Sequence, residues 1–118
     1  MYYQEYGRKY KNVNKEYGGH TYHSKREAEY AHQLDLLKKA RDKYVKVDKW
    51  ERQHKIDIRV HGVHICNYYV DFKVWFADGR IEIHEVKGFA TDTWKLKWKL
   101  TEAIFATEHP EIGLKVIK

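Results

Sequence analysis

Two runs of β-branched and aromatic residues, joined by one short turn signal, constrain the fold more than any other feature of the chain. The first run covers residues 63–76 and the second covers residues 81–87. Between them, Ala77-Asp78-Gly79 has the composition of a hairpin loop with glycine in the left-handed position. We therefore expect a long antiparallel hairpin that places the two runs side by side.

A third strand is expected before this hairpin and a fourth at the end of the sequence. From Val45 the sequence changes to a period of two, and residues 55–60 alternate between charged and apolar side chains, which is typical of a strand with two different faces. His61-Gly62 follows and predicts a tight turn into the next strand. Residues 113–118 predict a short last strand.

Two segments predict helices. Ser24 and Glu27 form an S-x-x-E capping box, and apolar residues follow at helical spacing to about residue 41, where basic side chains favour a helix end. A second helix is expected over about residues 92–107. A strand-helix-strand ending implies a right-handed crossover and a parallel pair. The fold class expected is α/β: a mixed four-stranded sheet flanked by helices.

The 118 residues suit one domain. Residues 1–19 are polar and punctuated by glycine, so we expect a flexible basic-aromatic arm there and the folded domain over residues 20–118. The single cysteine, Cys66, excludes an intramolecular disulfide and a cysteine-rich zinc site, and it fits a reducing compartment. Without a signal-like or membrane-spanning apolar run, a cytoplasmic protein with no membrane partner is expected.

The charge balance leaves two interpretations open. The net charge of +6 and the pI near 9.3 suit a partner such as nucleic acid, but they also suit ordinary solubility. Two H-x-x-H pairs, at residues 20–23 and 61–64, lie in different predicted elements, so they do not predict the four converging ligands of a zinc site. The sequence contains no nucleophile-elbow, phosphate-loop or dinucleotide-binding motif.

The hairpin carries the residues that indicate chemistry. Glu85 and Lys87 are two apart on one predicted strand and therefore share a face. With a three-residue loop Asp71 lies opposite Glu85, whereas a two-residue turn would place it opposite Val86. Two adjacent carboxylates repel unless a cation lies between them, and Mg²⁺ prefers such oxygens. A neighbouring lysine can orient water or stabilise phosphate charge. The alternative is an exposed cross-strand ion pair that contributes ~0–1 kcal/mol.

These motifs and their order resemble the PD-(D/E)XK nuclease superfamily. More narrowly, they are similar to its small phage-borne endonucleases and to Holliday-junction-resolvase-like nucleases. The resemblance covers about residues 20–118 and rests on Ser24-Lys25-Arg26-Glu27-Ala28, Tyr69-Val70-Asp71-Phe72 and Glu85-Val86-Lys87-Gly88. Val70 stands where the proline of the family name would be. The resemblance implies a restriction-endonuclease-like core in the order helix-strand-strand-strand-helix-strand.

The resemblance also implies roles for individual residues. Asp71, Glu85, Glu27 and the main-chain carbonyl of Val86 would bind Mg²⁺, with Mn²⁺ as a substitute. Asp71, Glu85, Lys87 and Glu27 would form the catalytic set. For Glu27 a second interpretation stays open, because the third residue of a capping box can serve the helix alone.

Five residues are expected to contact nucleic acid: Lys25, Arg26, Gln53, Lys95 and Lys97. The role of Gln53 rests on its weak match to a polar residue at the edge of the family's site. Lys97 falls within the apolar arc of the second helix, where it either snorkels from the core or faces a DNA phosphate. Trp94 and Trp98 share this arc and are expected in the core.

The function expected is Mg²⁺-dependent hydrolysis of DNA phosphodiester bonds by an endonuclease. Its substrates would be duplex, nicked or branched DNA in phage recombination or junction processing, in the host cytoplasm. Cutting two strands needs two active sites, so a homodimer is expected. One alternative is a nuclease-fold module that binds nucleic acid without catalysis and tends to lose the acidic set. Another is a protein-binding domain without salt-dependent affinity for DNA.

Overall fold

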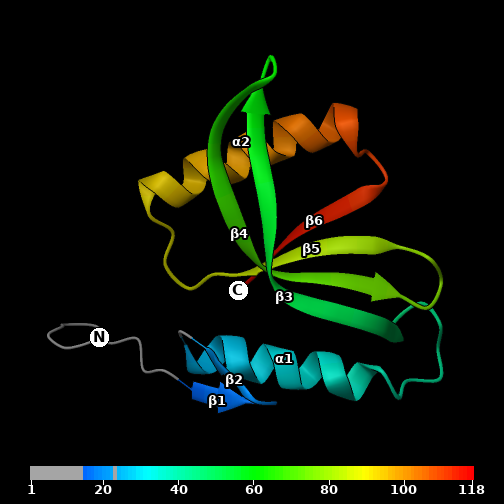
Figure 1. Cartoon of the computed structure of the whole chain (residues 1–118). Helices are drawn as coiled ribbons and strands as arrows, with labels where there is room; N and C mark the ends of the chain where they lie inside the picture. Colours follow the sequence, from blue (N-terminus) through cyan, green and yellow to red (C-terminus); the bar gives the residue numbers. More distant parts are fainter. Residues whose placement is uncertain (1–14, 23) are drawn as a thin grey trace, which may run out of the picture.

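The computed structural model describes residues 15–22 and 24–118, which form a four-stranded mixed sheet with helices on opposite faces (Figure 1). This α/β architecture agrees with the prediction from sequence. In chain order the elements are β1 (Lys15–Tyr17), β2 (His20–Tyr22), α1 (Lys25–Leu37), β3 (Val47–Val60), β4 (Val63–Phe76), β5 (Ile81–Val86), α2 (Asp92–Glu108) and β6 (Ile112–Ile117).

The main sheet has the strand order β3-β4-β5-β6. The first three strands are antiparallel, and β5 and β6 pair in parallel, as expected from the strand-helix-strand ending. The connection between the parallel strands contains α2. Because helices cover both faces, residues 82–86 of the interior strand β5 are all buried. Polar side chains on β5 therefore require hydrogen-bond partners inside the protein.

Each helix packs on its own apolar cluster. One cluster lies against α1 and the other against α2. The buried members of the first are Tyr22, Ala28, Ala31, Leu34, Val47, Phe72, Val74 and Val86. The buried members of the second are Ile56, Ile58, Tyr68, Val70, Ile83, Trp98 and Phe105. Trp98 and its half-buried neighbour Trp94 both belong to the second cluster, as predicted.

The two hairpin turns have the backbone that their sequences predict. His61 and Gly62 have φ values of 51° and 81°, as a two-residue turn with both central residues left-handed requires. Residues 77–80 separate β4 from β5, and the Phe76 N–H donates to the Arg80 carbonyl at 2.9 Å. This bond leaves a loop of residues 77–79, which includes Gly79 at φ 97°. With this three-residue loop the β4–β5 pairing runs from Trp75 opposite Ile81 to Phe72 opposite His84.

A kink in β3 changes which helix the long β3–β4 hairpin faces. Gln53 has φ 52° although it lies inside a strand, where a left-handed non-glycine residue is disfavoured by roughly 1–2 kcal/mol. Phe72, on the side of the kink nearer the β4–β5 loop, packs toward α1. Val70 and Tyr68, on the side nearer the His61-Gly62 turn, pack toward α2. In a straight strand these three alternate residues would all point to one face. Figure 1 shows the outer part of the hairpin crossing in front of α2.

Several strand and helix boundaries differ from the predictions by one or two residues, and two differ by more. Helix α1 ends at Leu37 rather than near residue 41, because Lys38 and Lys39 donate to carbonyls three residues back, which tightens the last turn. The expected flexible arm, residues 1–19, lies mostly outside the described residues. Its last part instead pairs Lys15–Tyr17 with His20–Tyr22, across two glycines with positive φ. No described helix combines the length and apolarity needed to cross a membrane.

Candidate active site

Asp71 and Glu85 lie buried where β4 and β5 separate, with 9% and 2% of their surface exposed. The regular pairing ends at Phe72 opposite His84, so the next pair in this register is Asp71 opposite Glu85. Here side chains replace the backbone ladder. The Asp71 N–H donates to Glu85 Oε1 at 2.6 Å, and the Val86 N–H donates to Asp71 Oδ2 at 2.8 Å. The predicted opposition of the two acids is confirmed.

Two aromatic side chains hold the second oxygen of Glu85. The Tyr68 hydroxyl and the Trp94 indole N–H both donate to Oε2, each at 2.6 Å. Tyr68 lies on the α2 side of the sheet because the hairpin changes the helix that it faces at the Gln53 kink. Burial, and then the charge of Glu85, raise the pKa of Tyr68, so its hydroxyl stays a donor. The Glu85 carboxylate is therefore fixed by three donors, each at hydrogen-bond distance.

Glu27 of α1 joins this acidic pair. The pKa of Asp71 is raised to about 8, first by burial and then by the charges of Glu85 and Glu27; a side-chain hydrogen bond with Glu27 adds to the effect. Two carboxyl groups can share such a bond only when one of them carries a proton. In the cap of α1, Ser24 Oγ accepts from the Glu27 N–H at 3.1 Å, a bond that uses the backbone of Glu27 and not its carboxylate. The Glu27 side chain contacts Asp71.

The chemistry of these donors fits a divalent cation. No ion pair between the described residues involves Glu27, Asp71 or Glu85. Among the described residues their negative charge is stabilised by uncharged N–H and O–H donors, not by a positively charged side chain. Glu85 Oε1 accepts one backbone bond and keeps a lone pair, and Asp71 Oδ1 accepts from none of the described backbone donors. As they stand, however, the described His, Cys, Asp and Glu residues form no group of three or more arranged to hold a metal.

Lys87 and Glu85 both contact the side chain of Trp94. The Lys87 ammonium nitrogen is 5.3 Å from the centroid of the Trp94 ring, whose N–H binds Glu85. The Lys87 backbone N–H donates to the Ile117 carbonyl at 2.9 Å, which fastens this end of β5 to β6. Glu85 and Lys87 therefore reach the same side of the strand, as their spacing predicts.

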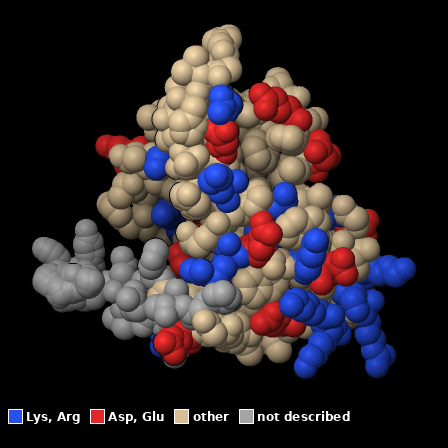
Figure 2. Space-filling view, viewed as in Figure 1, with Lys and Arg blue, Asp and Glu red and all other residues tan. Residues whose placement is uncertain are grey.

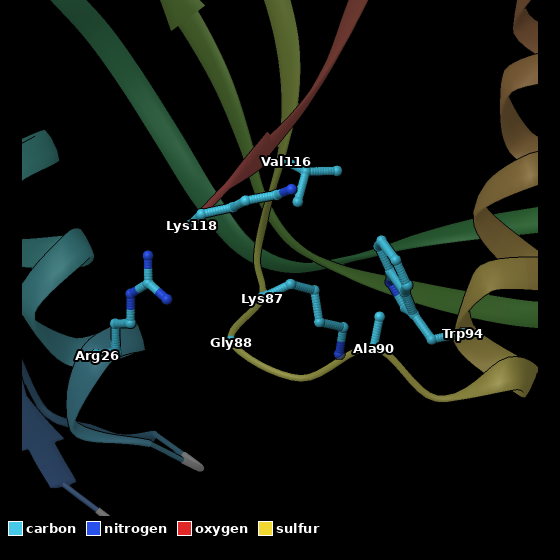
Figure 3. A pocket seen from close by; sticks show the side chains of 7 residues that line it. All are labelled: Arg26, Lys87, Gly88, Ala90, Trp94, Val116 and Lys118. Carbon is cyan, nitrogen blue, oxygen red and sulfur yellow. The ribbon is translucent and has the colours of Figure 1, made fainter.

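Beside Lys87 opens a pocket of about 430 Å³ (Figure 3). Arg26 reaches it from α1, Lys87 from the end of β5 and Lys118 from beyond the end of β6. In Figure 3, Lys87 and Ala90 lie between Arg26 and Trp94, and Lys118 extends alongside Val116. The lining comprises Arg26, Lys87, Gly88, Ala90, Trp94, Val116 and Lys118, so its three charged side chains are all basic.

The five expected nucleic-acid contacts separate in space. Arg26 lines the pocket, whereas Lys25 and Lys95 are exposed and lie outside its lining. Lys97 is half-buried and also lies outside the lining, so its two interpretations stay open. Gln53 lies between the pairs Arg52–Phe72 and His54–Val70, which places it opposite Asp71 and beside the acids.

Basic side chains also gather away from the pocket. Figure 2 shows lysine and arginine concentrated over the carboxyl end of α1 and the loop that leads to β3. Elsewhere on this face, acidic and basic side chains are interspersed. Net charge alone therefore does not locate the site; the lining of the pocket, with its three basic residues, is the more specific signal.

A buried chain of polar groups ties α1 to β5. The Tyr30 hydroxyl lies 2.7 Å from His84 Nδ1, and His84 Nε2 lies 2.8 Å from Glu82 Oε1. The second Glu82 oxygen pairs with Arg80 at 2.9 Å and with Lys115 at 3.5 Å. Burial lowers the pKa of His84, against the opposing effect of its bond to Glu82. This chain anchors the helix that carries Arg26 and Glu27.

Sequence reasoning missed four parts of this arrangement: the contact of Tyr68 with Glu85, the donor role of Trp94, the place of Lys118 in the pocket, and the polar chain through His84. The alternation of Glu82 and His84 with apolar residues was visible, but it is the burial of both faces of β5 that gives those residues internal partners.

A family model described as "Protein of unknown function (DUF1064)" matches residues 7–118, nearly the whole chain. The chain belongs to the DUF1064 family. Comparisons with curated proteins and with solved structures found no match. In this DUF1064 protein the buried acids, Lys87 and the basic pocket are all within the matched range.

Proposed function

We propose that this DUF1064 protein is a metal-dependent endonuclease of the PD-(D/E)XK type that hydrolyses DNA phosphodiester bonds. The observation that carries the proposal is the geometry of the acids: Asp71 and Glu85 are buried side by side and hydrogen-bonded across β4 and β5, with Glu27 of α1 against Asp71. Lys87 stands beside that cluster across Trp94, at the wall of a basic pocket. Such a combination of acids and cations suits cleavage of a phosphodiester.

In the proposed reaction the residues of the site have three different roles. Asp71, Glu85, Glu27 and the carbonyl of Val86 would hold Mg²⁺ or Mn²⁺, which when bound supplies charge neutralisation and an activated water. Tyr68 and Trp94 keep Glu85 in one orientation through their hydrogen bonds. The Lys87 ammonium would hold a phosphate oxygen or the attacking water beside the acids.

The same arrangement supports a second candidate, a module that binds nucleic acid without cutting it. Both oxygens of Glu85 accept hydrogen bonds from the protein, which is what a structural carboxylate does. In that case the acids would only shape the fold next to the basic pocket. We place it second because such a module has no need of Glu27 beside Asp71, where it raises the pKa further.

Incubation with closed circular supercoiled plasmid, and with a four-way junction, separates the two candidates. The nuclease should cut with Mg²⁺ or Mn²⁺ and stop in EDTA. Asp71→Asn and Glu85→Gln should bind DNA at least as tightly as the wild type but not cut it. Asp57→Asn, on the exposed part of β3, is the matched control and should cut normally. Wild-type binding without cutting in any metal would favour the second candidate, and cutting in EDTA would overturn the mechanism.

The finer parts of the proposal concern substrate, core and assembly. We infer that the restriction-endonuclease-like order describes α1, β3–β5, α2 and β6, with the β1–β2 hairpin added in front. The substrates proposed are duplex, nicked or branched DNA in recombination or junction processing, in the cytoplasm, with a homodimer delivering paired cuts. Size-exclusion chromatography with light scattering, with and without a junction, tests the assembly.

A further inference from the structure

The pocket beside Lys87 has a chemistry of its own. Its three cations come from three separate places in the fold: Arg26 from the first turn of α1, Lys87 from just after β5, and Lys118 from just after β6. None of the three forms an ion pair with another described residue. Unpaired cations that line one hollow attract an anion.

The size of the pocket limits what that anion can be. Its volume of about 430 Å³ is near the lower end of the ~300–1,000 Å³ range of small-molecule sites. It can admit one nucleotide-sized group but not the width of a duplex. Trp94 does not offer a free stacking face on its inner side, because it stacks on Trp98 with the ring centroids 5.7 Å apart. Recognition therefore depends on charge rather than on a base.

The number of cations favours a doubly charged group. A phosphodiester in a nucleic-acid backbone carries one negative charge, whereas a terminal phosphate monoester carries about −1.5 to −2 at pH 7. With three basic side chains and no acidic one in its lining, the pocket stabilises the monoester more strongly. Arg26 can also form the two-pronged contact that suits a phosphate.

We propose that this pocket binds the terminal phosphate of a nucleic-acid strand, at a chain end or at a nick. The inference rests on the proposed function for its substrate class. Trp94 contacts both Lys87, which lines the pocket, and Glu85. A phosphate bound in the pocket is therefore separated from the acids only by the Trp94 side chain. Arg26 and Lys118 are then substrate-binding residues, and the protein prefers phosphorylated ends to unphosphorylated ones.

Binding of short single-stranded DNA in EDTA tests the proposal without any cleavage. Three oligonucleotides of one sequence are compared by fluorescence anisotropy: one with a 5′-phosphate, one with a 3′-phosphate and one with hydroxyl ends. At least one phosphorylated form should bind roughly tenfold tighter than the hydroxyl form, as one charge-assisted contact provides. The arm that binds tighter identifies the strand end, and inorganic phosphate should compete with it.

Variants then locate the preference. Arg26→Gln and Lys118→Gln should each reduce the preference for phosphorylated ends at least about threefold. Lys25 is next to Arg26 but outside the lining, so Lys25→Gln is the control and should weaken the binding of all three oligonucleotides equally. Melting temperatures identify any variant that fails to fold, and a double variant of the two pocket residues provides a second reading. Equal affinity for all three oligonucleotides in the wild type, or a preference that survives in both pocket variants, overturns the proposal.

This result is independent of the nuclease test. Closed circular plasmid has no strand ends, so its cleavage does not require a terminal-phosphate site. A protein that cuts the plasmid but ignores terminal phosphates is a nuclease without this pocket function. A protein that prefers phosphorylated ends but cuts nothing has the pocket function without the proposed catalysis.

Discussion

Replacement of Asp71 by asparagine should make the fold less sensitive to pH. The folded-state pKa of Asp71 is about 8, raised by burial and by the charges of Glu85 and Glu27, against an ordinary value of 3.8. Above pH 5 the unfolded chain has released this proton, while the folded protein keeps it. The stability that the proton contributes is therefore complete below about pH 4 and is lost as the pH rises through 8.

The size of the effect follows from this difference in proton binding. One proton held only by the folded state makes the free energy of unfolding fall by about 1.4 kcal/mol per pH unit. At pH 8 half of the folded molecules have released the Asp71 proton. Between pH 6 and pH 8 the free energy of unfolding therefore falls by roughly 2 kcal/mol. The asparagine side chain mimics the protonated acid, since its carbonyl oxygen can still accept from the Val86 N–H.

The measurement is urea unfolding in EDTA, followed by tryptophan fluorescence at pH 6 and pH 8. Wild type should lose roughly 2 kcal/mol more than Asp71→Asn over this interval. Burial lowers the pKa of His84, which has the opposite effect near pH 6 but is common to both proteins and cancels in the comparison. Asp57→Asn is the matched control, because hydrogen bonds from Arg59 and His64 lower the pKa of Asp57, and its contribution is lost only in acid. Equal losses in wild type and Asp71→Asn would refute the raised pKa.

Three further outcomes are expected. Mg²⁺ or Mn²⁺ should raise the melting temperature of wild type more at pH 8 than at pH 6, because the cation competes with the proton on Asp71; an equal rise in Asp71→Asn would place the cation elsewhere. Glu27→Gln should leave the melting temperature nearly unchanged, since the Ser24 cap accepts from the backbone, yet slow cleavage at least ~100-fold, or about 2.7 kcal/mol. Near wild-type cutting would reduce Glu27 to a helix residue. Affinity for DNA should fall steeply between low and physiological salt, measured by anisotropy, as lysine and arginine contacts release counterions; a flat response would indicate a protein-binding domain.

The parts of the fold that could be predicted depend on short-range patterns. Ala77-Asp78-Gly79 specifies its loop length through the left-handed glycine, and the loop length alone places Asp71 opposite Glu85. The S-x-x-E box likewise locates the start of α1. Both signals are complete within a few residues, so nothing distant has to be known.

The parts that could not be predicted depend on tertiary contacts. Glutamine has no special preference for positive φ, so the sequence carries no local sign of the kink at Gln53. Without that kink, Tyr68 and Asp71 would point to opposite faces of β4 by simple alternation. The contact of Tyr68 with Glu85 is therefore invisible to any reading of periodicity.

Lys118 and Trp94 show the same limit in a different form. Lys118 reaches the pocket because β6 pairs in parallel with β5, up to Val86 opposite Ile117. Helical periodicity places Trp94 correctly in the apolar cluster but does not report where its N–H is directed. Sequence patterns assign a side chain to a face, while its polar partner depends on the packing of two elements.

The kink at Gln53 divides the β3–β4 hairpin into two parts with different tolerance to changes in length. Beyond it, residues 54–70 lead out to the His61-Gly62 turn and back, so two residues added to each strand there would keep both the alternation and the pairing of the acids. One residue added between Asp71 and Glu85 would instead move a carboxylate to the other face of the sheet. Insertions and deletions among DUF1064 proteins are therefore expected to accumulate at the tip of this hairpin and to spare the three-residue loop after β4.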